Sequence, residues 1–307
     1  MGRRAIGSGI AVIINAGSGS VGAPDEAVRV RERFHAQGID PESCVCVQNK
    51  EIRQHAEEAL QRGCWAVVAG GGDGTVSTVA SVVAATDAAL GVLPLGTLNH
   101  FAKDAGIPLD LDDAVATVAQ GHTAVLDLGE VNGRTFINNS SLGLYPLIVQ
   151  HREMHQRMGR SKWWAFFRGA LTVLGWYPVL HVTLSAGEKT IIRKTPFLFV
   201  GNNEYKIDGL KLGTRSSMDA GALSVYMAHQ VGRSGLLALV LRAMFGRIRD
   251  AEQLDIFSTE ELQVDIRTHR TRVALDGEVV VMAPPLRFRC RKGGLRVLVP
   301  KREGDSS

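Results

Sequence analysis

The sequence predicts an α/β domain with a parallel sheet, followed by a second domain made mainly of antiparallel β-strands. Over residues 1–123, short apolar runs alternate with segments of helical periodicity, a pattern typical of parallel strands covered by helices on both faces. From residue 124 to 300, β-type runs follow one another closely, and dipeptides such as Asn132-Gly133 and Asp276-Gly277 indicate hairpin turns. Residues 301–307 are expected to form a polar tail.

The elements of the first domain are predicted from its apolar runs and from the residues that break them. Asp110 is placed to cap the last helix, with Asp113 as its capping-box partner, and Gly121 follows the end of that helix. A polar loop at 96–103 opens a further helix. The expected strands are 10–14, 43–47, 64–69 and 90–95, and the other expected helices are 25–36, 51–61, 76–84 and 111–120.

The second domain is expected to consist of short strands joined by turns, with Ala186-Gly187 marking a third hairpin. The expected strands are 125–131, 135–139, 179–185, 190–193, 196–200, 223–228, 262–267, 271–275, 279–281, 286–289 and 295–299.

Three loops follow predicted strand ends, and the stretch 70–75, which reads Gly-Gly-Gly-Asp-Gly-Thr, is the most distinctive of them. Glycines let a backbone approach a phosphate closely, and the unpaired N–H groups at a helix start attract anions. The other loops are 15–20 and 96–103, and the strand ends of an open α/β sheet form its ligand-binding edge. A tight turn without a ligand is the alternative. Asp73 would repel a phosphate unless it holds a metal ion, orients a lysine or contacts a sugar hydroxyl.

The composition limits the function classes without selecting one. The formal net charge of +4 suits a phosphate-bearing partner or an anionic membrane surface. The four cysteines show no paired metal-ligand spacing, so we expect reduced thiols in a cytosolic protein. We find no signal peptide and no run of about 18 apolar residues. Apart from residues 161–178, no basic stripe with interleaved aromatics is present, which argues against nucleic-acid binding.

Two stretches stand apart from the β pattern. Residues 161–178 carry three of the four tryptophans and follow several arginines, a combination that suits a membrane interface. A helix buried against the β-rich domain explains them equally well. Residues 234–249 begin at Ser234 and end in arginines, and because cations are favourable at a helix C-terminus, an ordinary helix is the preferred interpretation.

The ordered loops resemble the nucleotide-binding domain of the diacylglycerol kinase catalytic family, which includes bacterial lipid kinases and the sphingosine and ceramide kinases. The middle motif alone is shared with NAD kinases and phosphofructokinases, but the ordered set is more specific. The residues that carry the resemblance are 15–19, 71–75 and 94–102, and the stretches 127–129, 201–203, 219–223 and 276–278 look like the second-domain motifs of the family in the right order.

The resemblance implies a Rossmann-like first domain, as in NAD kinases and lipid kinases, with ATP bound in a cleft between the two domains. Glu278 would be the general base that takes the proton of a lipid hydroxyl. Phosphoryl transfer needs Mg²⁺ on the phosphates, and Asp73 is a candidate ligand or orienter near the nucleotide. The expected phosphate contacts are Asn15, Ser18, Gly19, Gly71, Gly72, Gly74, Thr75 and Thr97.

Two positions depart from the family pattern. The third loop reads Asn99-His100-Phe101 where the family usually has Asn-Asp-Phe. Asn99 and His100 are the candidate substrate contacts of this loop. Because a histidine cannot replace the negative charge of an aspartate, the usual polar network around Asp73 is not expected in the same form. Ala220 stands where many bacterial members have the aspartate that binds a structural Mg²⁺, so either Asp219 takes over as the ligand or the site is lost.

The sequence therefore predicts an ATP-dependent lipid kinase of the cytoplasm that docks transiently on the inner face of the membrane. Its substrate would be diacylglycerol or a related lipid alcohol. A nucleotide-binding regulator without kinase activity, motivated by His100 and Ala220, is one alternative, and a kinase for a soluble substrate such as NAD is another. The edge strands of the β-rich domain could pair between two copies of the chain, so a homodimer is a further hypothesis.

Overall fold

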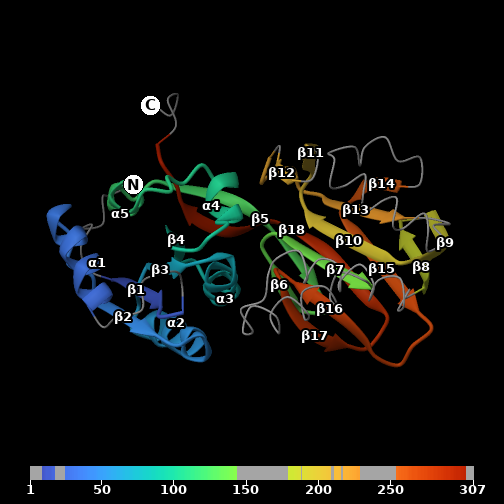
Figure 1. Ribbon diagram of the computed structural model, residues 1–307, viewed down its shortest axis with the longest axis horizontal. Helices are drawn as coiled ribbons and strands as arrows, with labels where there is room; N and C mark the ends of the chain where they lie inside the picture. The colour runs from blue at the N-terminus through green and yellow to red at the C-terminus, as the bar shows by residue number, and fades with distance from the viewer. Residues whose placement is uncertain are drawn as a thin grey trace, which may run out of the picture. The chain divides into compact units, whose positions relative to one another are not determined.

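The computed structural model describes residues 9–17, 25–143, 179–187, 189–208, 211–215, 217–228 and 254–301 (Figure 1). The chain divides into two compact units, unit 1 with residues 1–128 and 292–307 and unit 2 with residues 129–291. Ser18, Gly19 and the two stretches 161–178 and 234–249 lie outside the described residues. Among the helices that are described, none combines the length and the hydropathy needed to cross a bilayer.

Unit 1 is built on a parallel sheet whose central strands are buried. Its strands are β1 (Ile10–Asn15), β2 (Ser43–Val47), β3 (Ala66–Gly71) and β4 (Ala89–Pro94). They are arranged in the order β2-β1-β3-β4, and every neighbouring pair is parallel. β3 and β4 are buried at every position, as expected of strands covered on both faces.

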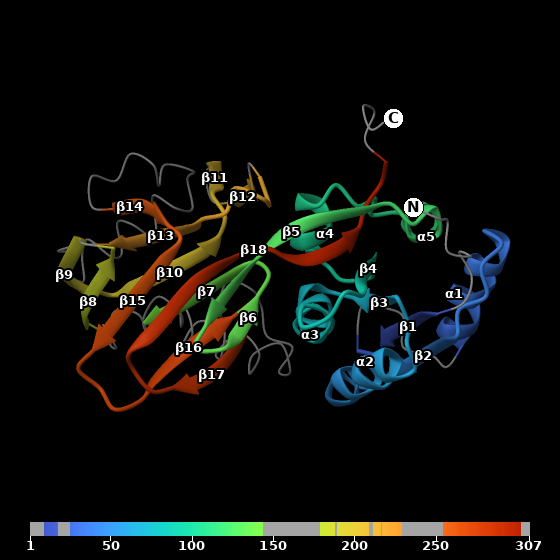
Figure 2. The same cartoon turned by 180° about the vertical axis from the view of Figure 1, so that it is seen from behind.

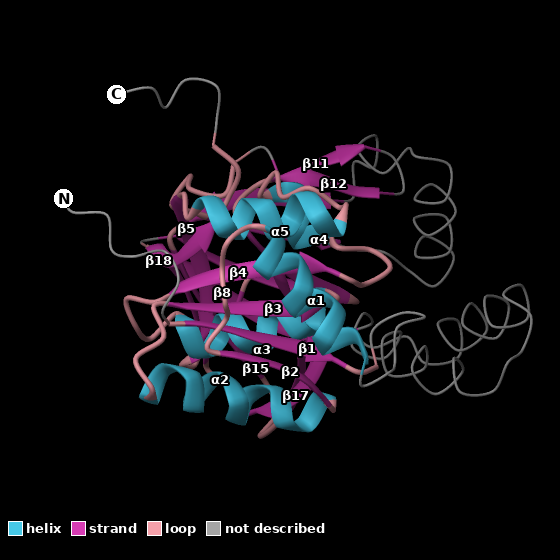
Figure 3. Ribbon diagram, turned by 90° about the vertical axis from the view of Figure 1, so that its left-hand side faces the viewer, coloured by secondary structure: helices cyan, strands magenta, loops and turns pink. Residues whose placement is uncertain are grey.

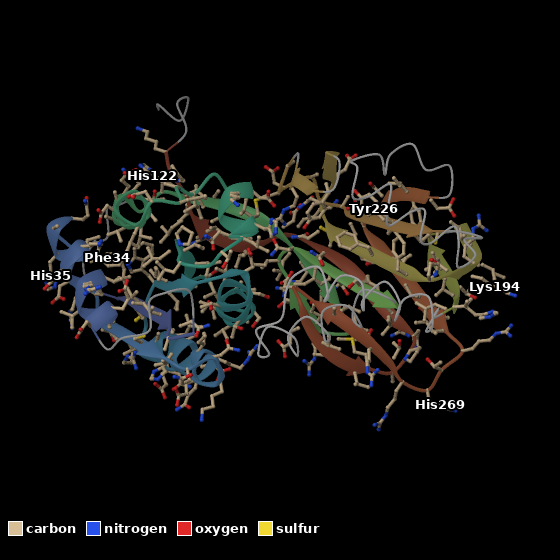
Figure 4. All side chains as sticks on the ribbon, viewed as in Figure 1. Phe34, His35, His122, Lys194, Tyr226 and His269 are labelled. Carbon is tan, nitrogen blue, oxygen red and sulfur yellow. The ribbon has the colours of Figure 1, made fainter. Side chains whose placement is uncertain are left out.

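Helices cover both faces of this sheet (Figures 1 and 3). α1 (Asp25–Ala36) packs with α5 (Leu111–Gln120), and α2 (Ile52–Gln61) packs with α3 (Asp73–Val83). A 3-10 turn, η1 (Asn49–Glu51), precedes α2, and the short α4 (His100–Asp104) follows β4. Phe34 is fully buried on α1, while the next residue, His35, is exposed (Figure 4).

Unit 2 is a β-sandwich with antiparallel pairing in both sheets. One sheet runs β14-β13-β10-β7-β16-β17 and the other contains β18-β15-β8-β9. Figure 2 shows β7, β16 and β17 side by side. Side chains from both sheets meet in one apolar core, where Leu142 and Leu198 cluster with Val264 and Phe288. The bounds are β5 (Thr123–Val131), β6 (Arg134–Phe136), β7 (Asn139–Gly143), β8 (Leu180–Ala186), β9 (Lys189–Thr195), β10 (Phe197–Asn202), β11 (Tyr205–Asp208), β12 (Lys211–Arg215), β13 (Leu223–Ala228), β14 (Leu254–Thr259), β15 (Glu261–Ile266), β16 (Thr271–Leu275), β17 (Glu278–Met282) and β18 (Leu286–Leu298).

The division between the units falls within two long strands that pair with each other, β5 and β18. The sequence predicts two strands at 286–289 and 295–299, but the structure joins them into the single strand β18. Val297 near its end lies opposite Leu90 of β4 in parallel register. Residues 292–307 therefore belong with unit 1. The sequence instead places domain boundaries after residues 123 and 300. Within β18, Gly293 has a φ of 61°, a backbone conformation that favours glycine.

The predicted fold class, an α/β domain with a parallel sheet followed by an antiparallel β domain, is confirmed. Individual elements differ for local reasons. The predicted strand 135–139 is interrupted at Ile137 and Asn138, because their N–H groups bind the carboxylate of Asp276 instead of a strand. α3 begins three residues before its predicted start because Gly72 serves as its N-cap. The sequence does not predict β11, β12 and β14.

Candidate functional site

Three loops follow neighbouring parallel strands at one edge of the unit 1 sheet. Ile14 of β1 lies opposite Gly70 of β3, and Gly71 lies opposite Pro94 of β4. The loops after β1, β3 and β4 therefore meet at the carboxyl edge of the sheet, where ligands bind in open α/β folds.

The first two loops are joined by a hydrogen bond between Asn15 and Thr75. Nδ2 of Asn15 donates to Oγ1 of Thr75 at 3.0 Å, and Oδ1 of Asn15 accepts the N–H of Gly17 at 3.0 Å. Thr75 is 2% exposed. Because a hydroxyl carries one proton as well as acceptor lone pairs, Thr75 accepts from Asn15 and keeps its own proton to donate.

The space around the glycines of the second and third loops differs from one position to the next. A methyl group placed on Gly96 would overlap the Cα of Gly72, and one placed on Gly71 would overlap the side chain of Thr75. Gly96 is small because the third loop packs against the backbone of the second, and Gly71 is small because the Thr75 side chain occupies the space beside it. At Gly74, by contrast, no atom of the described chain lies within 4 Å of an added methyl.

The start of α3 is left open to an anion. Gly72 is its N-cap and makes no side-chain capping hydrogen bond to the first turn. Uncapped N–H groups and the positive end of the helix dipole together favour a bound anion. The space above Gly74, in the first turn, is therefore where a phosphate can approach the backbone.

Asp73 joins the second loop to the third. Its Oδ1 accepts the N–H of Phe101 at 3.0 Å, and its Oδ2 accepts the N–H of His100 at 3.2 Å. The sequence leaves a metal, a lysine or a sugar hydroxyl as the partner of this carboxylate, but in the structure it binds the first backbone amides of α4. Because residue 100 contributes its backbone, a histidine there supports this network as well as an aspartate does.

Asn99 shapes the third loop from within. It adopts the left-handed conformation with φ of 50° and is 9% exposed. Its Oδ1 accepts the N–H of Gly96 at 3.1 Å, and its Nδ2 donates to the carbonyls of Pro94 and Gly96 at 3.0 and 2.8 Å. The amide of Asn99 thus holds the loop, whereas Thr97 and His100 are exposed.

In unit 2, Glu278 is the exposed first residue of β17 and lies opposite Leu275 across a tight turn. The turn residues Asp276 and Gly277 have φ of 48° and 92°, as a two-residue hairpin requires. The Asp276 carboxylate is engaged by backbone amides. It accepts the N–H groups of residues 137, 138 and 139 at 2.8, 2.8 and 3.0 Å. Sequence reasoning missed this anchor; the available signal is an aspartate at a left-handed turn position.

Asp219 is the candidate ligand that the sequence leaves for a structural magnesium ion. Asp219 is exposed, and its Oδ1 accepts a hydrogen bond from the Ser217 hydroxyl. Within the described ranges, no three His, Cys, Asp or Glu side chains gather where they could hold a metal ion. Magnesium binding by Asp219 stays a prediction. A magnesium ion carried by nucleotide phosphates keeps several waters and needs only one or two carboxylates.

Comparisons with known proteins place this architecture in a family. Residues 9–131 match the model of the diacylglycerol kinase catalytic domain, and residues 148–299 match that of the YegS C-terminal NAD kinase beta sandwich-like domain. A protein of Pseudomonas aeruginosa named "Probable lipid kinase YegS-like" is 31% identical over 264 residues, 82% of each chain. One of the same name from Pseudomonas syringae pv. tomato is 32% identical over 261 residues, 81% of each chain.

A solved structure shares the fold. The crystal structure of a diacylglycerol kinase from Bacillus anthracis str. Sterne superposes with a TM-score of 0.69 at 16% identity, covering 95% of this chain and 97% of that one. The curated relatives and the matched domains show that the chain belongs to the YegS-like lipid kinase family, whose members are phosphotransferases with a diacylglycerol kinase catalytic domain.

Proposed function

We propose that the protein transfers the γ-phosphate of ATP to the hydroxyl of a lipid alcohol such as diacylglycerol. The observation that carries this proposal is the open start of α3, set between the Asn15–Thr75 hydrogen bond and the closely packed Gly72 and Gly96. A helix start of this kind suits the phosphates of a nucleotide. In this proposal unit 1 binds ATP and unit 2 binds the lipid.

The described loop residues take distinct parts in phosphate binding. The N–H groups of Gly72 and Gly74 approach the phosphates without a side chain between them. Thr75 donates the hydroxyl proton that its hydrogen bond from Asn15 leaves available. Asp73 holds the third loop, which carries Thr97, against the second. Bound to the phosphates of ATP, magnesium would supply positive charge that offsets theirs during transfer.

Glu278 supplies the acid–base chemistry. A lipid hydroxyl attacks the γ-phosphorus, a new bond forms between the lipid oxygen and phosphorus, and the bond to the bridging oxygen of ADP breaks. The hydroxyl proton passes to the carboxylate of Glu278 as the new bond forms. The exposed position of Glu278, beside a turn anchored by Asp276, supports this role.

The lipid substrate also implies a place of action. An enzyme that acts on an insoluble alcohol must reach it at a bilayer surface, so we propose a cytoplasmic protein that docks on the inner face of the membrane. Its net charge of +4 favours an anionic surface.

The proposal is tested by incubating the protein with γ-labelled ATP, Mg²⁺ and a panel of lipid alcohols in mixed micelles, followed by lipid extraction and chromatography. Diacylglycerol, monoacylglycerol, phosphatidylglycerol and a sphingoid base make up the panel, and NAD and simple sugars are tested without detergent. Label in one lipid, lost when EDTA removes Mg²⁺, is the expected result. Label only in a soluble acceptor, or ATP binding with no labelled product from any acceptor, would contradict the proposal.

A further inference from the structure

The peptide segment 137–139, which interrupts the predicted strand, is held from two opposite sides. On one side its three N–H groups bind the carboxylate of Asp276. On the other side the carbonyl of Ile137 accepts Nη1 of Arg215 at 2.6 Å, and Oδ1 of Asn138 accepts Nη2 of Arg215 at 3.0 Å. The two charged side chains therefore act on one short segment.

The charges meet opposite ends of the same peptide group. The group between Ile137 and Asn138 offers its N–H to the Asp276 carboxylate at 2.8 Å and its C=O to the Arg215 guanidinium at 2.6 Å. This orientation aligns the peptide dipole with both charges, and hydrogen bonds in such a chain polarise one another. Charge-assisted hydrogen bonds are about twice as strong as neutral ones.

The charged side chain of Arg215 is buried in this arrangement. Arg215 is 6% exposed, so its guanidinium needs hydrogen bonds to offset the loss of water. It also donates to the carbonyl of Asn202 at 3.4 Å, and its charge lies 5.8 Å from the ring centre of Tyr205. Tyr205 in turn donates its hydroxyl to the carbonyl of Asn138 at 2.9 Å. The arginine is fixed in place and fixes the segment in turn.

We propose that Arg215 is a positioning residue for Glu278, acting through the 137–138 peptide and Asp276 on the turn from which Glu278 extends. This inference rests on the proposed role of Glu278 as the general base. Reaction rates depend steeply on the placement of a catalytic group, and a misplacement of about 1 Å can cost about 100-fold. Loosening the Arg215 side of the segment should therefore lower kcat.

Two substitutions of Arg215 separate its charge from its shape. Arg215→Met keeps the apolar stem and removes the charge, whereas Arg215→Lys keeps the charge but loses the planar fork that reaches two acceptors. We expect both to lower kcat by about 10- to 100-fold, with KM for ATP within about twofold of wild type. Arg193→Met is the matched control, because Arg193 makes an exposed ion pair with Asp255 on β14.

A double-mutant cycle in kcat between Arg215 and Asp276 distinguishes positioning from a purely structural role. If both residues act on one peptide, the double variant Arg215→Met with Asp276→Asn loses no more kcat than the more damaging single variant. Independent, multiplicative losses would overturn the inference, as would a folded Arg215→Lys protein with wild-type kcat. Should Arg215→Met fail to fold in a thermal melt, the lysine variant with Asp276→Asn supplies the cycle.

Failure of this inference is distinguishable from failure of the proposed function. In a Glu278→Gln background, residual phosphate transfer should not respond to Arg215→Lys, because the group being positioned has lost its basicity. Full activity of Glu278→Gln itself would reject the proposed role of Glu278. An inactive Glu278→Gln protein beside a fully active Arg215→Lys protein would reject only the role of Arg215.

Discussion

Oδ1 of Asp73 accepts the backbone N–H of Phe101 at 3.0 Å and so ties the start of α3 to the start of α4. The two helices follow adjacent strands, and this contact, with the one to the N–H of His100, sets the spacing of the second and third loops. A charged side chain thus orders the site through backbone amides, independently of the neighbouring side chains.

Asp73→Asn should weaken this tie. An amide offers one acceptor oxygen, so one of the two N–H groups loses its partner. We expect the free energy of unfolding to fall by about 1–2 kcal/mol and the affinity for ATP to fall with it. Urea unfolding and isothermal titration calorimetry measure the two effects. Asp112→Asn, which breaks an exposed ion pair with Arg33, is the control, and equal unfolding free energies for both variants would contradict the account.

Changing His100 should have little effect on the network. Its contribution to Asp73 is a backbone N–H, which every residue except proline provides. We expect His100→Ala and His100→Asp to keep the unfolding free energy within about 0.5 kcal/mol of wild type, as is usual for exposed positions. Kinase activity should stay within a few-fold. A large loss in both variants would show that the histidine ring itself is needed.

Gly74 and Gly96 should respond differently to alanine. At Gly96 the added methyl overlaps the backbone of Gly72, so Gly96→Ala should lower stability and ATP affinity together. At Gly74 the methyl enters open space in a helix, where alanine is favoured over glycine by about 0.5–1 kcal/mol. Gly74→Ala should therefore melt at an equal or higher temperature yet bind ATP weakly. Unchanged ATP affinity in that variant would show that phosphate does not approach Gly74.

Both boundaries of α5 are predicted correctly from local signals. For α5, Oδ1 of Asp110 accepts the N–H groups of Asp112 and Asp113 at 2.9 and 3.2 Å, and Gly121 takes the left-handed conformation that ends a helix. The position of the three loops at one edge of the sheet could likewise be predicted, because parallel strands place their carboxyl ends at the same edge.

The features that the sequence does not predict depend on partners far along the chain. The interruption at Ile137 is caused by Asp276, 139 residues away, and no local pattern near 135–139 announces it. The continuous β18 pairs with β4 and β5, which come much earlier in the chain. The role of Asp73 depends on α4 presenting its amides, which is a consequence of tertiary packing.

Two cysteines, the half-buried Cys44 and the buried Cys64, give a prediction on pH. Burial raises the pKa of Cys44 and of Cys64 from 9.0 to about 11 in each case. Because the unfolded thiols ionise at lower pH than the folded ones, the unfolded state binds fewer protons between pH 9 and 11, and stability falls over that range. The free energy of unfolding should therefore decline between these pH values.

A variant with both Cys44 and Cys64 changed to alanine serves as the reference for this effect. Its own stability will differ, but the slope of its unfolding free energy against pH should be shallower above pH 9. In the native protein both thiols should also react slowly with iodoacetamide at neutral pH, because the thiolate is the reactive form. Equal slopes for the two proteins would contradict the assignment of raised pKa values.

The measurement that tests the central claim most directly compares Glu278→Gln with Glu261→Gln in phosphate transfer from labelled ATP to lipid. Both residues are the exposed first residues of antiparallel strands in unit 2, so they are matched in setting. The account predicts that Glu278→Gln lowers kcat by about 100-fold or more, as loss of a general base does, while ATP binding is kept. Glu261→Gln should match wild type. Wild-type kcat in Glu278→Gln would contradict the claim.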